Sequence, residues 1–238
     1  MDMIINRIAH YADIAIPQFQ ELLSVPHRVE IREPGQEIVN SGEVVDYVFI
    51  VEEGWAIRYQ LLDDGRRQIV NFMLPGDCFD LMSLTKAKSD HNVSAATQVK
   101  LRRIKSDDFL SVIKTNPELA TAFWWVAIQE ESILREQIVR NGRMSAKERI
   151  ASLILELNRR LSISTGLQDN SLHLPVPRTH LADALGLSVV HVSRTLAWLK
   201  REGYIATEPG MIHILKRDAM AEMAEFEDLH LNIAKLRY

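Results

Sequence analysis

Cysteine is nearly absent, since Cys78 is the only cysteine among 238 residues. A single thiol excludes an internal disulfide, and it also excludes zinc sites and iron–sulfur clusters that are built from several thiolates. We interpret Cys78 as a small buried hydrophobic side chain, with a redox-active thiol as the alternative.

Long hydrophobic runs are also missing. The longest nearly apolar run, residues 120–128, is far shorter than the roughly 20 residues that span a bilayer. The first residues, MDMIINRIAHYADIAI, have no uninterrupted apolar core behind a basic head, so they make a poor secretory signal. We therefore expect no membrane partner and a cytoplasmic location.

Strong charge of one sign is absent as well, because the formal net charge is only −4. The charge is nevertheless uneven: residues 143–217 hold eleven Lys/Arg against six Asp/Glu, and residues 1–142 hold fifteen against twenty-one. This asymmetry favours a nucleic-acid surface in the basic part, although a solvated surface of mixed charge explains it equally well. The 47% of hydrophobic residues and the chain length suit two globular domains.

The N-terminal half changes its periodicity. Apolar spacings of three and four over residues 4–24 predict an amphipathic helix. From Val29 to Ile104, short runs rich in Val, Ile, Tyr and Phe are punctuated by five glycines, which predicts a compact antiparallel β-roll: Gly35, Gly42, Gly54, Gly65 and Gly76. Asp63 to Arg67, DDGRR, is typical of a hairpin turn.

A long helix is predicted from Pro117, after Asn116, to Gly142, because no breaker intervenes. One apolar position recurs every seven residues and suggests a dimer seam: Leu119, Val126 and Ile133. Packing of this helix on its own domain is the alternative. Trp124 and Trp125 are interpreted as packing residues, with cofactor stacking as the other reading.

The C-terminal part has the pattern of a winged helix-turn-helix. Ser145 to Leu161 is strongly amphipathic, and a short helix capped by Thr179 is expected to end at Leu185. Gly186 suits a left-handed turn, and Ser188 suits the cap of a second helix, which Gly203 ends. Apolar positions favour packing of the two helices across the turn: Leu181, Leu185, Leu187, Val192, Leu196 and Leu199. Tyr204 and Ile205 would pair with MIHIL as a wing.

The second helix carries few polar groups with which to read DNA. Arg194 can present two donors to guanine, and Ser193 can bond to a base or a phosphate. Val189 and Val190 offer only apolar contact, whose natural target is the thymine methyl. An ordinary solvent-exposed arginine is the alternative for Arg194. The predicted DNA-binding residues are Thr179, Ser188, Val189, Val190, His191, Ser193 and Arg194.

These features together resemble the Crp/Fnr superfamily of bacterial transcription regulators. The resemblance depends on PGQEIVNSGEVVDYVFIVEEGWAIRY and PGDCFD in the predicted roll, and on LADALGLSVVHVSRTLAWLKREGYI in the C-terminal part. It implies an α+β fold with a sensor β-roll like a cyclic-nucleotide-binding jelly roll (residues 1–115), a dimerisation helix with linker (116–142) and a winged helix-turn-helix with a C-terminal helix (143–238). It also implies a homodimer on a two-fold symmetric, double-stranded operator, under the control of an effector.

The sequence departs from the cyclic-nucleotide-binding members of that family. The position of their ribose-binding glutamate is Leu81 here, and their Arg-Ser pair for the phosphate aligns with His91 and Asn92. A largely neutral histidine is a poor substitute for a permanent bidentate cation. We therefore expect an effector other than cyclic AMP or cyclic GMP, in a pocket formed by Asp80, Leu81, Met82, Ser83, His91, Asn92, Leu134 and Arg135.

Several alternatives remain open at this level. His91 could mark a site for another small anion, a pH-sensitive contact or an ordinary loop histidine. Arg135 is equally ambiguous, no cofactor is expected, and haem is not excluded. Many family members carry a glutamate at the position of Val190, so the usual operator consensus is in doubt, while Ser193 and Arg194 match the Fnr-like branch.

The functional prediction is a sequence-specific, DNA-binding transcription regulator. The alternatives are a cyclic-nucleotide-responsive regulator and a nucleotide-sensing module that acts on a partner protein. An enzyme is not expected, because no nucleophile, base and orienting group cluster in the sequence. The acidic tail has helical spacing in Met223, Phe226, Leu229 and Ile233, which predicts packing on the C-terminal domain; RNA polymerase is a further candidate partner.

Overall fold

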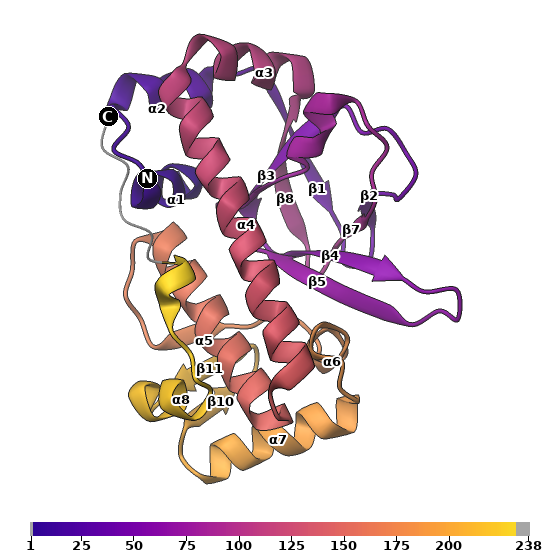
Figure 1. The fold of residues 1–238 in the computed structure, drawn as a ribbon, viewed down its shortest axis with the longest axis vertical. Coiled ribbons are helices and arrows are strands. Elements are labelled where there is room, and N and C mark those ends of the chain that lie inside the picture. The colour runs from indigo at the N-terminus through magenta and orange to yellow at the C-terminus, as the bar shows by residue number, and fades with distance from the viewer. Residues whose placement is uncertain (1, 232–238) are drawn as a thin grey trace.

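The structure, a computed structural model, describes residues 2–231 and has the α+β architecture that the sequence predicts (Figure 1). Two helices open the chain, α1 (Met3–Tyr11) and α2 (Ile16–Ser24). The single helix expected over residues 4–24 is therefore wrong. Pro17 lies in the first turn of α2 and has no N–H with which to continue a helix, so the chain extends at Ala12 and begins again at Ile16.

The N-terminal half forms the expected antiparallel β-roll. Two four-stranded sheets have the orders β1-β8-β3-β6 and β2-β7-β4-β5. Their strands are β1 (His27–Arg32), β2 (Glu37–Val39), β3 (Tyr47–Glu53), β4 (Ala56–Leu61), β5 (Arg67–Met73), β6 (Cys78–Phe79), β7 (Asn92–Ala95) and β8 (Val99–Lys105). Side chains from both sheets fill the space between them, such as the stacked Phe49 and Phe79 of the first sheet and Val93 of the second. A short 3-10 helix, η1 (Leu81–Thr85), interrupts the roll.

Two turn glycines show why the roll needs them. Gly65 has φ +83° in the turn between β4 and β5, where Leu62 N–H donates to the Arg66 carbonyl, so DDGRR is a hairpin turn as predicted. Gly54 has φ +75°, and a Cβ atom there would lie 2.0 Å from the carbonyl oxygen of Gln98. The turn that follows β3 therefore excludes every other side chain on steric grounds.

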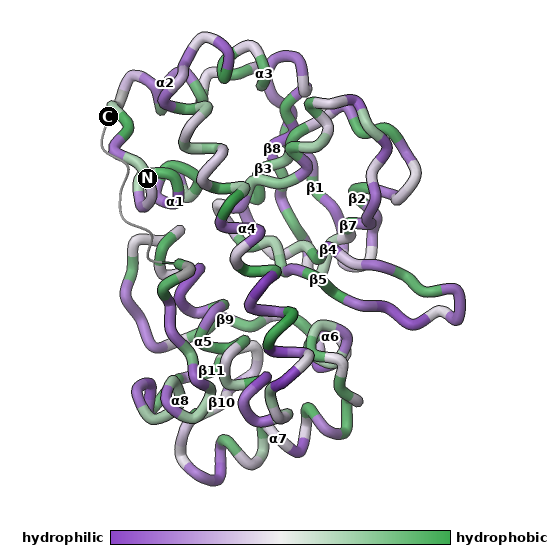
Figure 2. Tube along the Cα trace, viewed as in Figure 1, coloured by the Kyte–Doolittle hydropathy of each residue, from purple (hydrophilic) through white to green (hydrophobic). Residues whose placement is uncertain are grey.

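Beyond the roll, α3 (Ser106–Thr115) leads to the long helix α4 (Pro117–Arg143), whose bounds agree with the prediction. The Asn116 side chain accepts from Leu119 N–H at 3.2 Å and caps α4. Figure 2 shows hydrophobic and hydrophilic residues alternating along α4, as expected for a helix that buries one side. No helix among residues 2–231 combines the length and the hydropathy that a bilayer crossing requires.

The C-terminal part packs against both α4 and the roll (Figure 1). Its elements are α5 (Ala146–Thr165), β9 (Ser171–His173), α6 (Arg178–Leu185), α7 (Val189–Arg201), β10 (Ile205–Glu208), β11 (Met211–Ile214), α8 (Arg217–Met223) and η2 (Asp228–Leu231). Ser145 and Glu148 form a capping box at the start of α5. The strands form a three-stranded sheet in the order β10-β11-β9.

The acidic tail is not one helix. Helix α8 ends at Met223, and Glu225 adopts a positive φ of 46°, which breaks the helical path before η2 begins at Asp228. Phe226 packs on the C-terminal core as expected, but Leu229 is exposed and Ile233 lies outside the described residues.

Candidate DNA-binding surface and effector pocket

Helices α6 and α7 form the predicted helix-turn-helix. Gly186 takes the left-handed conformation, with φ +62°, and Ser188 caps α7 by accepting from His191 N–H at 3.2 Å. The inner sides of both helices are buried in one core that includes α5, through Leu181, Leu185, Val192 and Leu199. Strands β10 and β11 pair as the expected wing. The outer side of α7 is therefore held in place by a continuous core.

Most of the predicted DNA-binding side chains lie on that outer side. Val189 is 40% exposed and Val190 is 66% exposed, while His191 and Arg194 are exposed too. Val190 and Arg194 are four residues apart on one helix, so their side chains are neighbours. An exposed valine gains nothing from water, but in a DNA major groove it can contact a thymine methyl while the neighbouring guanidinium donates to guanine acceptors.

One predicted role at this surface is wrong, that of Thr179, and one is confirmed, that of Ser188. Thr179 is exposed but does not cap α6, because α6 begins at Arg178 and Pro177 occupies the cap position. Proline at that boundary suits a helix start, since the terminal N–H groups have no partner inside the helix. Ser188 uses its hydroxyl as a cap acceptor, so it is a structural residue of the turn as well as a candidate contact.

Arg178 is a surface residue that the sequence did not single out. Its Nη1 donates to Ser193 Oγ at 3.0 Å, so the first residue of α6 reaches the middle of the predicted reading surface on α7. This exposed guanidinium adds a second cation beside Arg194. Its position at a helix start was visible in the sequence, but its contact across the turn was not.

A pocket of about 420 Å³ lies between the roll and α4. It brings together five of the predicted effector-pocket residues: Asp80, Leu81, Met82, His91 and Leu134. Further lining residues, which the sequence did not indicate, include Arg58 from β4 and Glu130 from α4. The pocket therefore exists where the resemblance places it, but with partly different walls.

Three predicted pocket residues do not line the cavity. Ser83 is buried and bonds to Ser106 Oγ at 2.9 Å. Asn92 Oδ1 accepts from Ser41 N–H at 3.0 Å, and the Arg135 guanidinium pairs with Glu131 and donates to Ser132 Oγ at 2.7 Å. These side chains bond elsewhere, which the alignment could not reveal because it matches positions along the chain and not side-chain directions.

Carboxylates dominate the polar wall of this pocket. Asp80 is fully buried, and its Oδ1 lies 3.2 Å from His91 Nε2, while His91 Nδ1 lies 2.7 Å from Asp90 Oδ1. The contact with His91 lowers the pKa of Asp90. Arg58 is the one Lys/Arg side chain among the described residues that line the pocket. A phosphate would thus meet three acidic groups, Asp80, Asp90 and Glu130, and one arginine.

The predicted dimer seam is wrong. Leu119, Val126 and Ile133 are all buried within the one chain. Leu119 packs in the core around α1 and α3, and Ile133 packs against Ile163 of α5. A second chain cannot reach these side chains in this fold.

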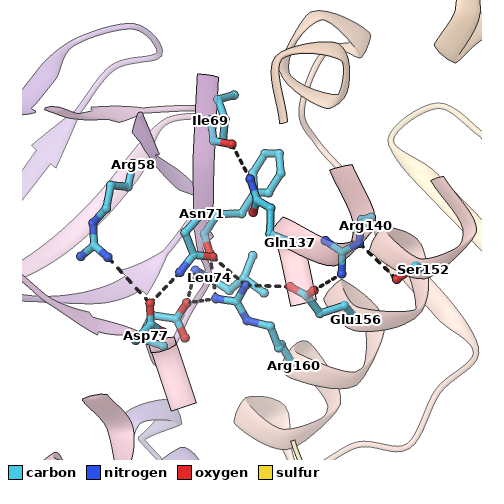
Figure 3. Close-up of polar contacts among 12 residues, drawn as sticks. Arg58, Ile69, Asn71, Leu74, Asp77, Gln137, Arg140, Ser152, Glu156 and Arg160 are labelled. Carbon is cyan, nitrogen blue, oxygen red and sulfur yellow. Dashed lines mark hydrogen bonds and ion pairs between the residues drawn. The ribbon is translucent and has the colours of Figure 1, made fainter. Parts of the chain in front are cut away.

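A buried charge network connects the roll to the C-terminal part (Figure 3). It consists of six charged side chains from α1, the loop before β6, α4 and α5: Arg7, Asp77, Glu130, Arg140, Glu156 and Arg160. The closely packed ion pairs compensate the cost of burying each charge. The sequence did not indicate this network, because its members lie far apart along the chain.

Comparison with known proteins agrees with this geometry. Residues 30–116 match the cyclic nucleotide-binding domain, and residues 148–223 match the Crp-like helix-turn-helix domain. The nitrogen fixation regulation protein FixK of Azorhizobium caulinodans is 34% identical over 185 residues, which are 78% of this chain and 73% of that protein.

Two further comparisons extend the similarity. The transcriptional activator protein FnrL of Cereibacter sphaeroides is 32% identical over 197 residues, 82% of this chain and 78% of that protein. The structure of FixK2 from Bradyrhizobium japonicum superimposes with a TM-score of 0.74 at 28% identity, covering 83% of this chain and 97% of that chain. With an interrupted β-roll, a long helix and a winged helix-turn-helix, the chain belongs to the Crp/Fnr family of DNA-binding transcription regulators.

Proposed function

We propose that the protein is a homodimeric, sequence-specific regulator that binds an inverted-repeat operator. In this proposal residues 1–115 sense, residues 116–142 join the two subunits and residues 143–238 bind DNA. The observation that carries it is that Val190 and Arg194 are both exposed, one helical turn apart, on the outer side of α7 above a buried core. Two such helices in a dimer would enter major grooves about one DNA turn apart.

The operator can be tested by selecting bound sequences from random DNA with the purified protein. We expect each half-site to contain a guanine read by Arg194 and a thymine next to Val190. Arg194→Ala should cost about 1–3 kcal/mol of binding free energy and relax the guanine preference. Arg28→Ala, at an exposed arginine on β1, is the matched control. Equal losses on selected and random DNA would contradict base reading by Arg194.

The dimer should form along the exposed stripe of α4. This stripe contains Trp124, which is 66% exposed, and Ile138, which is 72% exposed, and Glu131 lies midway between them. These three positions are seven residues apart, which is the spacing of a coiled-coil seam. Ile138 is followed by Val139, which is 49% exposed, so this end of the stripe presents adjacent apolar side chains to a partner.

Light scattering tests this stripe directly. Ile138→Asp would place a carboxylate in the seam, so we expect a monomer that binds the operator weakly. Val29→Asp, at a valine that is 53% exposed on β1, serves as the control and should remain dimeric. A dimeric Ile138→Asp protein would show that the subunits meet elsewhere.

We infer further that the effector is not a cyclic nucleotide. The polar wall of the pocket carries Asp80, Asp90 and Glu130 against Arg58, so a phosphate would be repelled more than it is attracted. Isothermal titration with cyclic AMP and cyclic GMP should show no saturable heat. Saturable binding that is lost in Arg58→Met would refute this inference.

A further inference from the structure

Arg160 is one of the contacts that attach the DNA-binding part to the roll. It belongs to α5, and its side chain is 2% exposed. Its Nη2 donates to the Phe72 carbonyl at 2.8 Å and to Asp77 Oδ2 at 2.7 Å, and its Nη1 donates to Asn71 Oδ1 at 3.0 Å. All three acceptors belong to the roll (Figure 3).

The guanidinium group makes this attachment directional. Its donors are fixed in one plane, so three acceptors on the roll determine both the distance and the orientation of α5. Helix α5 shares its core with α7, through residues such as Leu153 and Val192. Roll residues such as Phe72 belong to the same core, so apolar packing holds the two parts together while the position of Arg160 contributes to the direction of the recognition helix.

Compensating charges make the attachment specific. Asp77 also pairs with Arg7 from α1, while Glu156 pairs with both Arg160 and Arg140. The buried charge network thus contains three cations and three anions. Buried ion pairs of this kind add little net stability, but a displaced member would leave an uncompensated buried charge. Arrangements in which the C-terminal part is shifted or rotated relative to the roll are consequently disfavoured.

Glu130 connects this network to the effector pocket. It lines the pocket and is 16% exposed, and its carboxylate accepts from Asn71 Nδ2 at 2.6 Å and from Arg7 Nη2 at 3.1 Å. The amide of Asn71 therefore joins Glu130 on one side to Arg160 on the other. An occupant that moves the Glu130 carboxylate would change the acceptors available to Arg160.

A second contact restrains the same domain from another side. Arg67 of β5 donates through Nε and Nη2 to Asp183 Oδ2 of α6, at 2.9 and 2.8 Å, and Gln68 donates to the Ala184 carbonyl at 3.0 Å. These partly exposed bonds fix α6 at its end near the hairpin, whereas Arg160 fixes α5 in the interior.

We propose that Arg160 is a positioning residue for DNA recognition, and that Glu130 transmits the state of the pocket to it. In the dimer, Arg160 sets the separation and the relative rotation of the two recognition helices. This inference rests on the proposed dimeric operator binding. It predicts that changing Arg160 alters the preference of the folded dimer for one half-site spacing over another, in addition to any effect on the stability of the fold.

Half-site spacing provides a readout that a merely structural role would not change. The selected operator is compared with a version whose spacer is one base pair longer, which rotates one half-site by about a tenth of a turn. Wild-type protein should lose about tenfold in affinity on the longer spacer, because a rigid dimer must deform the DNA. Arg160→Met should bind the original operator more weakly and lose less than about threefold on the longer one.

Matched variants separate positioning from charge and from folding. Arg160→Lys keeps the charge but not the planar donors, so it should give an intermediate spacing penalty. Arg159→Met, at an arginine that pairs with Asp228, should keep the wild-type penalty. Asn71→Ala removes one acceptor and keeps the ion pairs, so it tests the idea even if Arg160→Met does not fold. If Arg160→Met and Asn71→Ala both lose as much affinity as the wild type on the longer spacer, the proposal is overturned.

Distance measurement gives an independent test. A spin label at Glu208→Cys on the exposed wing reports one wing-to-wing distance per dimer, and the native thiol, Cys78, is buried. The distance distribution should be narrow in the wild-type background and broad with Arg160→Met; Glu130→Gln should broaden it less. Unchanged widths would refute positioning by Arg160. A wild-type protein that is monomeric, or that binds no specific sequence, would instead refute the proposed function.

Discussion

Asp77→Asn should destabilise the protein strongly. The Asp77 carboxylate accepts from Arg7 and Arg160, and its Oδ2 also accepts from Leu74 N–H at 2.8 Å. Asparagine keeps the size but removes the charge, so the buried charge network would hold three arginines against the two remaining acids, Glu130 and Glu156. Removing one partner of a buried ion pair typically costs about 3–5 kcal/mol. This is a large part of the free energy of unfolding of a typical domain, which is roughly 5–15 kcal/mol.

Urea unfolding at pH 7 measures this cost. Circular dichroism should show a lower midpoint at an unchanged slope, with the protein concentration held constant because the proposed dimerisation would contribute to stability. Asp64→Asn, at a half-exposed aspartate that pairs with Arg66, is the control and should change the unfolding free energy by less than about 0.5 kcal/mol.

A double-mutant cycle identifies the source of the loss. Combining Asp77→Asn with Arg160→Met restores the balance of buried charge, so the double variant should be at least about 1 kcal/mol more stable than additivity predicts. A loss below about 1 kcal/mol for Asp77→Asn alone, or strict additivity, would refute the account of a compensated buried network.

Three further outcomes follow from the structure. Gly54→Ala should be much less stable in urea than Gly35→Ala, because both glycines have positive φ but only at Gly54 does a Cβ meet a carbonyl oxygen at 2.0 Å. Burial and the nearby Arg67 lower the pKa of His180, so the unfolded chain takes up a proton first and the unfolding free energy should fall as pH drops below about 6.5; a His180→Gln variant should lose that slope. Burial raises the pKa of the Cys78 thiol, so alkylation by iodoacetamide at pH 8 should be at least about 100-fold slower in the native protein than in urea, and fast native labelling would contradict its burial.

Local chemistry explains what could be predicted correctly about the DNA-binding surface. The cap at Ser188, the left-handed turn at Gly186 and the apolar spacing of α6 and α7 all act within a few residues of one another. The turn and the inner sides of both helices were therefore determined by the sequence alone, and so was the outer position of Val190 and Arg194. The sequence did not indicate Arg178 as part of this surface, because its hydrogen bond to Ser193 joins two different helices.

Helical periodicity could not distinguish the buried side of α4 from the exposed stripe that we propose as the dimer surface. Leu119, Val126 and Ile133 repeat every seven residues, and so do Trp124, Glu131 and Ile138. Both sets are compatible with a seam, and only the packing of α1, α3 and α5 decides which side is covered. The first set is buried in the chain's own core, whereas Trp124, Glu131 and Ile138 of the second set are exposed.

The sequence by itself determined the succession of β-roll, long helix and winged helix-turn-helix, because turns, caps and periodicity are local properties. Only the tertiary structure decided which side chains line the pocket and which charges meet in the interior. Asp77 and Arg160 are 83 positions apart, and no local rule relates them. Their pairing depends on α5 packing beside the roll, where burial makes each charge require a partner.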